Sequence, residues 1–320
     1  MARRSAWFTA GAGALAMLAV SAPALAGTAN RAWVSGHGTD ASGCGAPTAP
    51  CRSFQYVITN VIAPGGEIDV LDPAGYGALT IPFALSIVND GVGTAGIQAA
   101  SGGTGVTVAA LPSADVSLRG LTIEGASIGE TGIAFTTGRS LTIENCVVRH
   151  FAADGIDLDP SASGNFAISN TLVADNTGDG ILVLPTGAGT VTAMFNRVEL
   201  SSNGSDGLLF DGQSSTGTLN AAVFESVATH HTNTGFYAFT AIGKAPTTLS
   251  VFQSVSANND TGLEATGPGA TLIAAHSMIS GNADASWGIA SSGVIASYGD
   301  NYFAGNGPNN TGLLTMVSKQ

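Results

Sequence analysis

The feature that most constrains this chain is that it repeats. A glycine followed by an apolar residue recurs at intervals of 23 to 28 residues between residues 132 and 313. These glycines are Gly132, Gly155, Gly180, Gly207, Gly235, Gly262, Gly288 and Gly312. A second column of mostly apolar residues keeps the same phase, namely Val147, Leu172, Val198, Val227, Val255, Met278 and Tyr302. Two columns in phase indicate that each repeat is one structural unit.

Each repeat consists of strand-like runs. In stretches such as LTIENCVV (residues 141–148) apolar residues recur at every second position, which is the period of a β-strand and not of a helix. A unit of about 26 residues holds about three short strands and cannot bury its apolar side alone. The repeats must therefore stack into a solenoid.

The first residues predict an export signal. Arg3 and Arg4 precede an apolar run of small residues from 10 to 20, and Ala24-Leu25-Ala26 matches an A-x-A cleavage site. We expect Met1 to Ala26 to be removed and the mature protein to be secreted, either extracellular or periplasmic. No later segment reaches the ~18 uninterrupted apolar residues of a membrane span, so it should not be transmembrane.

The charge of the mature chain excludes nucleic acid as a partner. The full chain has a formal charge of −12, and without Arg3 and Arg4 it carries 8 Lys and Arg against 22 Asp and Glu, which gives −14. The few basic residues are scattered, whereas phosphate binding requires them to cluster.

The cysteines fit an exported protein. Cys44 and Cys51 lie seven residues apart in a Gly- and Pro-rich segment, which predicts a disulfide that closes a short loop. Cys146 stays unpaired, and within a strand-like run it is expected to be a small buried hydrophobic residue.

With these repeats, the chain resembles the right-handed parallel β-helix proteins of the pectate-lyase-like superfamily. Residues 31–81, RAWVSGHGTDASGCGAPTAPCRSFQYVITNVIAPGGEIDVLDPAGYGALTI, resemble the opening segment of exported bacterial members. The resemblance implies an all-β fold, a single-stranded right-handed parallel β-helix with three strands per coil and a short N-terminal capping helix. We therefore expect a signal peptide at 1–26, a strand, disulfide loop and capping helix at 27–66, and the β-helix at 67–320.

The two ends of the expected solenoid differ. Ser53 is a suitable N-cap for a helix whose Phe54, Val57, Ile58 and Val61 would cover the open end of the core. The last residues, GPNNTGLLTMVSKQ, offer no comparable helix. Because an uncovered coil leaves strand edges exposed, the sequence predicts self-association through the C-terminal coil.

Three aspartates precede successive repeat glycines. Asp154, Asp179 and Asp206 occupy a turn position, where a short carboxylate can accept a hydrogen bond from backbone N–H. The alternative is a calcium site, because stacked carboxylates repel one another unless a cation or firm hydrogen bonds relieve them. Calcium is the only cofactor that the sequence suggests.

Asp157 and Asp159 belong to a different position. If Ile156 and Leu158 point into the core, the two aspartates point outward about 6.5–7 Å apart. That separation is near the ~6.5–9.5 Å of an inverting glycosidase pair. The outward positions of neighbouring coils add more acids and aromatic residues, namely Asp211, Tyr237, Phe239 and Glu264. Acids beside aromatic rings are typical of a sugar-binding groove.

The catalytic motifs of the resembled family are missing. Polygalacturonase-like members carry N-T-D, an adjacent Asp pair, G-H-G and R-I-K, and this chain has only Gly36-His37-Gly38, within the expected cap. Lyases of this fold need calcium-binding acids with Arg or Lys, and here only Arg149 and Arg197 fall near a common coil edge. Asn145, Asn170 and Asn196 resemble the asparagine ladder of β-helix turns.

Two functions follow. The first is an exported protein without catalysis that binds polysaccharide or a glycan of the cell envelope, with Tyr237, Phe239, Glu264, Arg149 and Arg197 as the expected contacts. The alternative is a polysaccharide-degrading enzyme, of the glycoside hydrolase or polysaccharide lyase type, acting on the outer face. Its catalytic candidates are Asp157, Asp159 and Asp211, which would then have to share a cleft.

Overall fold

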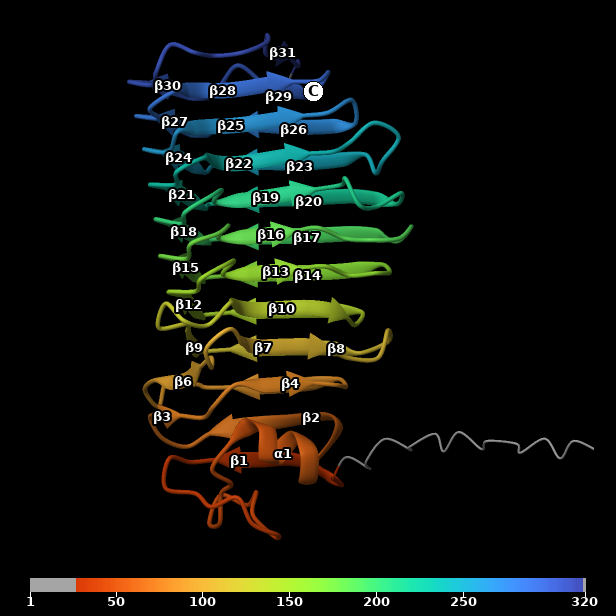
Figure 1. Cartoon of the computed structure of the whole chain (residues 1–320), viewed down its shortest axis with the longest axis vertical. Helices are drawn as coiled ribbons and strands as arrows, with labels where there is room; N and C mark the ends of the chain where they lie inside the picture. Colours follow the sequence, from red (N-terminus) through yellow and green to blue (C-terminus); the bar gives the residue numbers. More distant parts are fainter. Residues whose placement is uncertain (1–26, 319–320) are drawn as a thin grey trace, which may run out of the picture.

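The computed structural model describes residues 27–318 of the chain, and these residues form a parallel β-solenoid. Figure 1 shows the coils stacked along one long axis, with the short helix α1 (Phe54–Asn60) at the N-terminal end. Every strand pairs in parallel with the equivalent strand of the next coil. The expected all-β right-handed parallel β-helix with three strands per coil is confirmed.

Within residues 27–318 the strands belong to three sheets. The twelve-stranded sheet runs in the order β1 (Ala29–Val34), β2 (Ile62–Val70), β5 (Leu85–Val88), β8 (Asp115–Arg119), β11 (Ser140–Glu144), β14 (Gly164–Ser169), β17 (Thr190–Asn196), β20 (Thr218–Phe224), β23 (Thr247–Phe252), β26 (Ala270–Ala275), β29 (Val294–Ser297) and β31 (Thr315–Met316). The nine-stranded sheet runs in the order β28 (Ala285–Ala290), β25 (Thr261–Thr266), β22 (Thr234–Phe239), β19 (Leu208–Asp211), β16 (Ile181–Val183), β13 (Ile156–Leu158), β10 (Thr131–Thr137), β7 (Thr104–Ala109) and β4 (Leu79–Ile81). The ten-stranded sheet runs in the order β3 (Ala74–Gly75), β6 (Ala95–Gln98), β9 (Leu121–Glu124), β12 (Val147–Arg149), β15 (Leu172–Ala174), β18 (Glu199–Ser201), β21 (Val227–Thr229), β24 (Val255–Ala257), β27 (Met278–Ser280) and β30 (Tyr302–Ala304).

The glycine columns of the sequence become physical columns in the solenoid. The apolar residues that follow the repeat glycines, from Ile133 to Leu263, lie opposite one another on successive strands and are buried. Burial of this column inside the stack supplies the hydrophobic stabilisation that a single coil lacks.

The register expected from the sequence is wrong at three positions. Leu263 lies opposite Trp287 and not Ile289, and Gly312 lies outside every strand. The larger Trp287 side chain occupies the core position near the end of the solenoid and contacts Phe303 at 5.4 Å between ring centroids. In the second column Leu172 pairs with Glu199 and not with Val198.

The shift at Glu199 comes from the turn before β18. The turn needs a residue with positive φ, a conformation that Asn adopts more easily than most residues. Asn145 and Asn170 take this position in their coils, with φ of 54° and 47°, but in the next coil it is taken by Arg197, with φ of 53°. The strand therefore begins one residue later.

The asparagine ladder was predicted at the wrong residues. Asn145 and Asn170 are exposed in the turn, and Asn196 ends β17. The ladder is formed instead by Asn176, Asn203, Asn259, Asn282 and Asn306, with His231 between the second and third members. Each side-chain oxygen accepts a hydrogen bond from a backbone N–H of the preceding coil, and the Asn203 N–H donates to His231 Nδ1. This ladder supplies hydrogen-bond acceptors for the buried backbone N–H groups of the turns.

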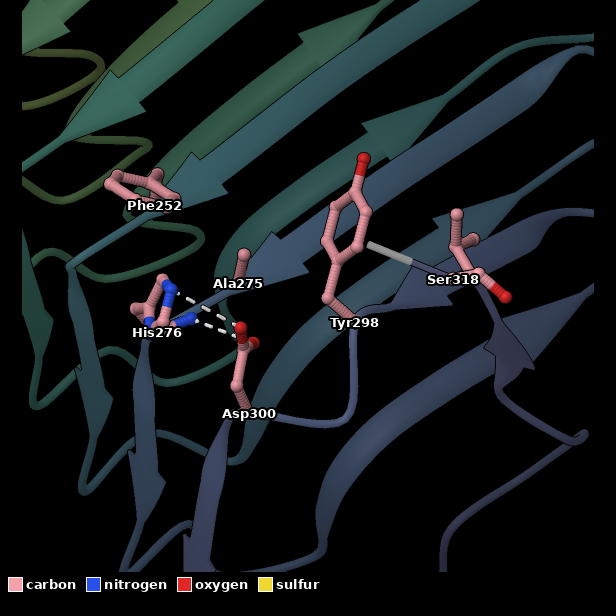
Figure 2. A pocket seen from close by; sticks show the side chains of 7 residues that line it. Phe252, Ala275, His276, Tyr298, Asp300 and Ser318 are labelled. Atoms are coloured by element: carbon pink, nitrogen blue, oxygen red, sulfur yellow. Dashed lines mark hydrogen bonds and ion pairs between the residues drawn. The ribbon is translucent and has the colours of Figure 1, made fainter. Parts of the chain in front are cut away.

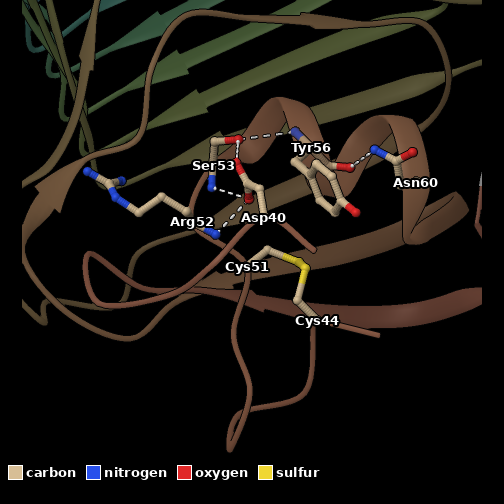
Figure 3. The surroundings of a disulfide bond; sticks show 7 residues. All are labelled: Asp40, Cys44, Cys51, Arg52, Ser53, Tyr56 and Asn60. Atoms are coloured by element: carbon tan, nitrogen blue, oxygen red, sulfur yellow. Dashed lines mark hydrogen bonds between the residues drawn. A yellow bond between two sulfur atoms is a disulfide. The ribbon is translucent and has the colours of Figure 1, made fainter. Parts of the chain in front are cut away.

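The N-terminal end is closed as predicted. Ser53 is the N-cap of α1 and accepts a hydrogen bond from the Tyr56 N–H, while Phe54, Val57 and Ile58 are buried. Asp40 orders the cap by accepting bonds from the backbone of residues 52 and 53 and from the Ser53 hydroxyl (Figure 3).

Cys44 and Cys51 form the predicted disulfide, which is drawn in Figure 3. Cys51 is fully buried against the cap. Replacing both cysteines by serine is expected to lower the free energy of unfolding by about 2 kcal/mol, because the open chain gains loop entropy. Urea unfolding followed by circular dichroism measures this. The double variant Thr39→Ala/Ser42→Ala in the same loop should change it by less than about 0.5 kcal/mol. An unchanged midpoint in the cysteine variant would contradict the stabilising role.

Cys146 is buried as expected, and its Sγ contacts the Leu118 carbonyl. Burial raises the pKa of its thiol to about 11. A thiol that stays protonated in the core is not a nucleophile.

The C-terminal end has no covering helix in the described residues. Tyr302, Leu313 and Met316 are 68%, 90% and 66% exposed. Self-association through this coil stays a prediction. The predicted signal peptide lies outside the described residues.

No helix within residues 27–318 is long and apolar enough to span a membrane.

Candidate functional site

The outer face of the nine-stranded sheet carries the acids and aromatic residues that the sequence singled out. We call this surface the acidic face and define it by its outward residues on β13, β19, β22 and β25 and directly after β13. They are Asp157, Asp159, Asp211, Tyr237, Phe239 and Glu264.

Asp157 and Asp159 point away from the core as predicted. Ile156 and Leu158 are fully buried, and the two aspartates alternate with them at half-buried positions. One oxygen of each, Oδ1, is buried and has no hydrogen-bond partner among the described residues. A ligand reaches each carboxyl group through its other oxygen, which is not among the buried atoms and can accept a hydrogen bond.

The surroundings of this pair favour the protonated, neutral form of both carboxyl groups. Burial, followed by repulsion from Asp154, Asp159 and Asp179, raises the pKa of Asp157 to about 6. Burial also raises the pKa of Asp159. A carboxyl with a pKa near 6 can donate or accept a proton near neutral pH.

Asp211 does not join this pair. It lies two coils beyond Asp159, about 10 Å along the stack at the usual strand spacing, with Leu184 between them. Its carboxylate accepts hydrogen bonds from the backbone and side chain of Gln213 at 2.7 and 2.5 Å. The three catalytic candidates therefore form one close pair and one separate residue.

Tyr237 and Phe239 form the aromatic part of the acidic face. Their rings meet edge to face with centroids 6.0 Å apart. Tyr237 lies opposite Glu264, which accepts hydrogen bonds from the hydroxyls of Thr234 and Thr266. Burial, with smaller effects from nearby acids, raises the pKa of Tyr237 to about 12. Its hydroxyl therefore stays protonated near neutral pH.

The aspartate stack beside this face has a structural role. The carboxylates of Asp154, Asp179 and Asp206 each accept a hydrogen bond from a backbone N–H of the next coil, at 2.7, 2.9 and 2.8 Å. The predicted turn role is confirmed. Among the described residues, the one group of three side chains with metal-ligand spacing is Asp40, Cys44 and Cys51, whose sulfurs are consumed in the disulfide. A calcium site at the stack remains a prediction.

The two arginines expected to contact substrate lie elsewhere. Arg149 ends β12 in the ten-stranded sheet and pairs with Glu124, with Nε and Oε2 2.9 Å apart. Arg197, in the turn after β17, donates to Asn170 and lies 3.8 Å from a Glu225 oxygen. Neither belongs to a strand of the acidic face.

A cluster of side chains that lines a cavity near the C-terminal end was not predicted from the sequence (Figure 2). It contains Phe252, His276, Tyr298 and Asp300 and borders a cavity of about 590 Å³. The sequence contains only a weak signal for this cluster. Phe224 and Phe252 are one repeat apart, but the next coil has Ala275 in the same column in place of a third aromatic residue.

Comparison with known proteins supports the fold. The family described as "Right handed beta helix region" matches residues 94–216. Among solved structures, an alginate lyase from Paenibacillus sp. str. FPU-7 has a TM-score of 0.58 and 13% identity, over 78% of this chain and 93% of its own. Pectate lyase Pel9A has a TM-score of 0.48 and 13% identity, over 84% and 80%. The Azotobacter vinelandii mannuronan C-5 epimerase AlgE6 A-module has a TM-score of 0.42 and 12% identity, over 79% and 89%. No curated protein sequence matches the chain.

Proposed function

We propose that this chain, which folds as a right-handed parallel β-helix, binds a neutral polysaccharide through the acidic face without cleaving it. The polysaccharide is a soluble glycan or a glycan of the cell envelope, which the protein meets after export. The disulfide between Cys44 and Cys51 supports export, because such bonds persist in oxidising compartments.

The observation that carries the proposal is the pair of half-buried carboxyl groups of Asp157 and Asp159 on this face, whose second oxygens are not among the buried atoms and have no hydrogen-bond donor in the described residues. Each of these accessible oxygens can accept a hydrogen bond from a donor on a ligand. Sugar hydroxyl groups are such donors. The apolar C–H faces of a sugar ring suit Leu182, Leu209 and Tyr237, which continue the Asp157 column along the sheet.

The charge of this face favours a neutral sugar over an acidic one. In residues 27–318 no Lys or Arg lies in a strand of the nine-stranded sheet. Several arginines elsewhere in the described residues are already paired, for example Arg139 with Asp115 and Arg149 with Glu124. A uronate chain would therefore meet carboxylates without a cation to neutralise it.

The aromatic contact gives a direct test. Replacing Tyr237 by alanine is expected to weaken binding of a neutral hexasaccharide by about tenfold, because the ring supplies contact area and a hydroxyl donor. Isothermal titration with hexasaccharides of glucose, mannose and galactose measures the affinity. Tyr237→Phe separates the hydroxyl from the ring, and Thr248→Ala on the twelve-stranded sheet is the control.

Two results would overturn the proposal. One is an affinity for every neutral hexasaccharide that Tyr237→Ala and Asp157→Asn leave unchanged. The other is binding of a hexauronate in preference to all of them.

A second function is favoured by the pKa values of the aspartate pair. A carboxyl with a pKa of about 6 at Asp157, beside Asp159, suits a general acid and base that hydrolyse a glycosidic bond. In that case Asp157→Asn abolishes the release of reducing ends. The rate would also fall as the pH rises above about 6, because Asp157 must be protonated to act as the acid.

A further inference from the structure

The C-terminal end of the solenoid is only partly closed. Figure 1 shows β28, β30 and β31 at this end, opposite α1. The segment after β30 covers the edge of β28, where Pro308 bridges to Ala285 and the Ile289 N–H donates to the Thr311 carbonyl. β31 covers part of the edge of β29. Among the described residues β30 pairs only with β27, so the ten-stranded sheet keeps an open edge.

The open edge of β30 presents the backbone groups of Phe303. The Tyr302 N–H donates to the Ser277 carbonyl, and the Ala304 carbonyl accepts a hydrogen bond from the Gly281 N–H. Both of these β30 residues therefore face β27. Because the backbone groups of successive strand residues point to opposite sides, the N–H and C=O of Phe303 point away from β27. They lie where one more strand would pair.

The same end exposes apolar side chains. Phe303 occupies an inward position, because it lies opposite the buried Ile279, yet it is 38% exposed. Four further exposed apolar residues belong to the same end, namely Tyr302, Leu313, Met316 and Val317. We call these four residues and Phe303 the end surface. Covering it would remove apolar side chains from water, which favours association.

The end surface belongs to an uncharged segment of an acidic protein. Residues 301–318 contain no Asp, Glu, Lys, Arg or His, whereas the whole chain has a formal charge of −12. Open strand edges are usually protected by charged side chains or proline, and β30 carries neither. Two copies of an acidic chain repel each other least where both are uncharged. The charge distribution thus favours contact between copies at this end.

The N-terminal end offers no equivalent edge, because the first strand of each sheet is covered. β1 bridges to Cys51, and Arg52 donates to the Gly75 carbonyl of β3. The Thr80 N–H of β4 donates to the Gln55 side chain of α1. A head-to-tail stack of copies, which would build a fibre, therefore has no open strand edge to join. The described surface that matches the end surface is the end surface of a second copy.

We propose that two copies of this chain associate end to end through their end surfaces, about a two-fold axis. The axis makes the strands of the two copies run antiparallel across the contact. An extended segment of one copy lies beside β30 of the other and pairs with the Phe303 backbone. The apolar side chains of both end surfaces are buried, and the result is a closed dimer and not a fibre.

The variant that tests the contact adds a charge without touching the core. Leu313→Lys changes a side chain that is 90% exposed, and Ile242→Lys, at an aliphatic side chain that is 87% exposed in the loop after β22, is the matched control. Sedimentation equilibrium between about 1 and 200 μM protein measures the mass and the dissociation constant of the dimer. Circular dichroism confirms that each variant is folded.

The parent protein and Ile242→Lys are expected to form dimers with a Kd of about 10 μM or below. Leu313→Lys should raise the Kd at least about tenfold, because the dimer would then bury two ammonium groups. Salt at about 0.5 M should strengthen the parent dimer, because it screens the repulsion between two acidic chains. The Phe303 amide should exchange its hydrogen slowly in the dimer and rapidly in monomeric Leu313→Lys.

Four results would overturn the inference. The parent protein could stay monomeric up to about 200 μM, or Leu313→Lys could dimerise as tightly as Ile242→Lys. Dissociation of the dimer by salt would indicate an ionic contact, which an uncharged surface does not provide. A dimer whose Phe303 amide exchanges as fast as that of the monomer would place the contact away from β30.

Discussion

Replacing Asn259 by alanine is expected to lower the free energy of unfolding by about 3 kcal/mol, because it leaves several buried polar groups without partners. The Asn259 oxygen accepts a hydrogen bond from the His231 N–H. Its amide nitrogen contacts the Ala228 carbonyl, Ser256 Oγ and Asn282 Oδ1 at 3.1 to 3.2 Å. The residue is 2% exposed, so water cannot replace these bonds in the folded protein.

Denaturant unfolding of Asn259→Ala beside Asn220→Ala measures this effect. Asn220 is an exposed residue of β20, and its replacement should change the free energy of unfolding by less than about 0.5 kcal/mol. Equal stability of the two variants would show that the ladder does not hold the turns together.

The second large effect concerns the aspartate stack. Replacing Asp206 by asparagine is expected to stabilise the protein by about 3 kcal/mol at pH 8, and not at pH 4. Burial, with repulsion from Asp179 and Glu264, raises the pKa of Asp206 to about 7, although the Thr234 N–H hydrogen bond opposes this. Asparagine keeps the acceptor for that N–H and removes the buried charge.

The direction of the pH dependence follows from linkage. The pKa of Asp206 is higher in the folded state than in the unfolded state. The carboxyl group therefore destabilises the folded protein at every pH at which it would be ionised in the unfolded chain. This destabilisation is absent below about pH 4, grows as the pH rises, and is complete above about pH 7. Unfolding of the variant and the parent protein at pH 4, 6 and 8 should therefore show a difference that grows with pH.

Comparing the Asp206→Asn variant with the parent protein isolates the contribution of Asp206 to the pH dependence of stability. His231, whose pKa burial lowers to about 4, destabilises both proteins as the pH falls below its unfolded value, so its effect cancels. The exposed Asp260→Asn is the control and should show no such difference. A difference that is constant with pH would contradict the buried-charge account.

The sequence predicted the solenoid because its period was visible in two independent columns. The inward positions after the repeat glycines, the Ser53 cap and the disulfide followed from local patterns that the structure confirms. The predicted register was wrong at Glu199 and Trp287. Before Glu199, the positive φ of the turn is adopted by Arg197 and not by an asparagine. Near the end of the core, the inward position is taken by Trp287 and not by the aliphatic residue that matches the column.

The asparagine ladder was misplaced for a related reason. Asparagine suits both an exposed turn with positive φ and a buried ladder, and the sequence does not distinguish the two uses at Asn170 and Asn176. His231 was not expected in the ladder, because its role depends on its Nδ1 replacing an asparagine oxygen as acceptor for the Asn203 N–H.

The candidate site was predicted in part. The outward direction of Asp157 and Asp159 follows from strand alternation, which the sequence shows directly. Their buried oxygens and the raised pKa of Asp157 depend on packing between coils, which no single repeat contains.

The central claim is that the protein holds a neutral glycan and does not cleave it. The most direct measurement incubates the protein with neutral hexasaccharides and with hexauronates, with calcium and with chelator, and determines retained ligand and shortened products by mass spectrometry. We predict retention of a neutral hexasaccharide, lost in the Asp157→Ala/Asp159→Ala variant, and no shortened product under either condition. Products that this variant no longer forms would establish an enzyme and contradict the claim.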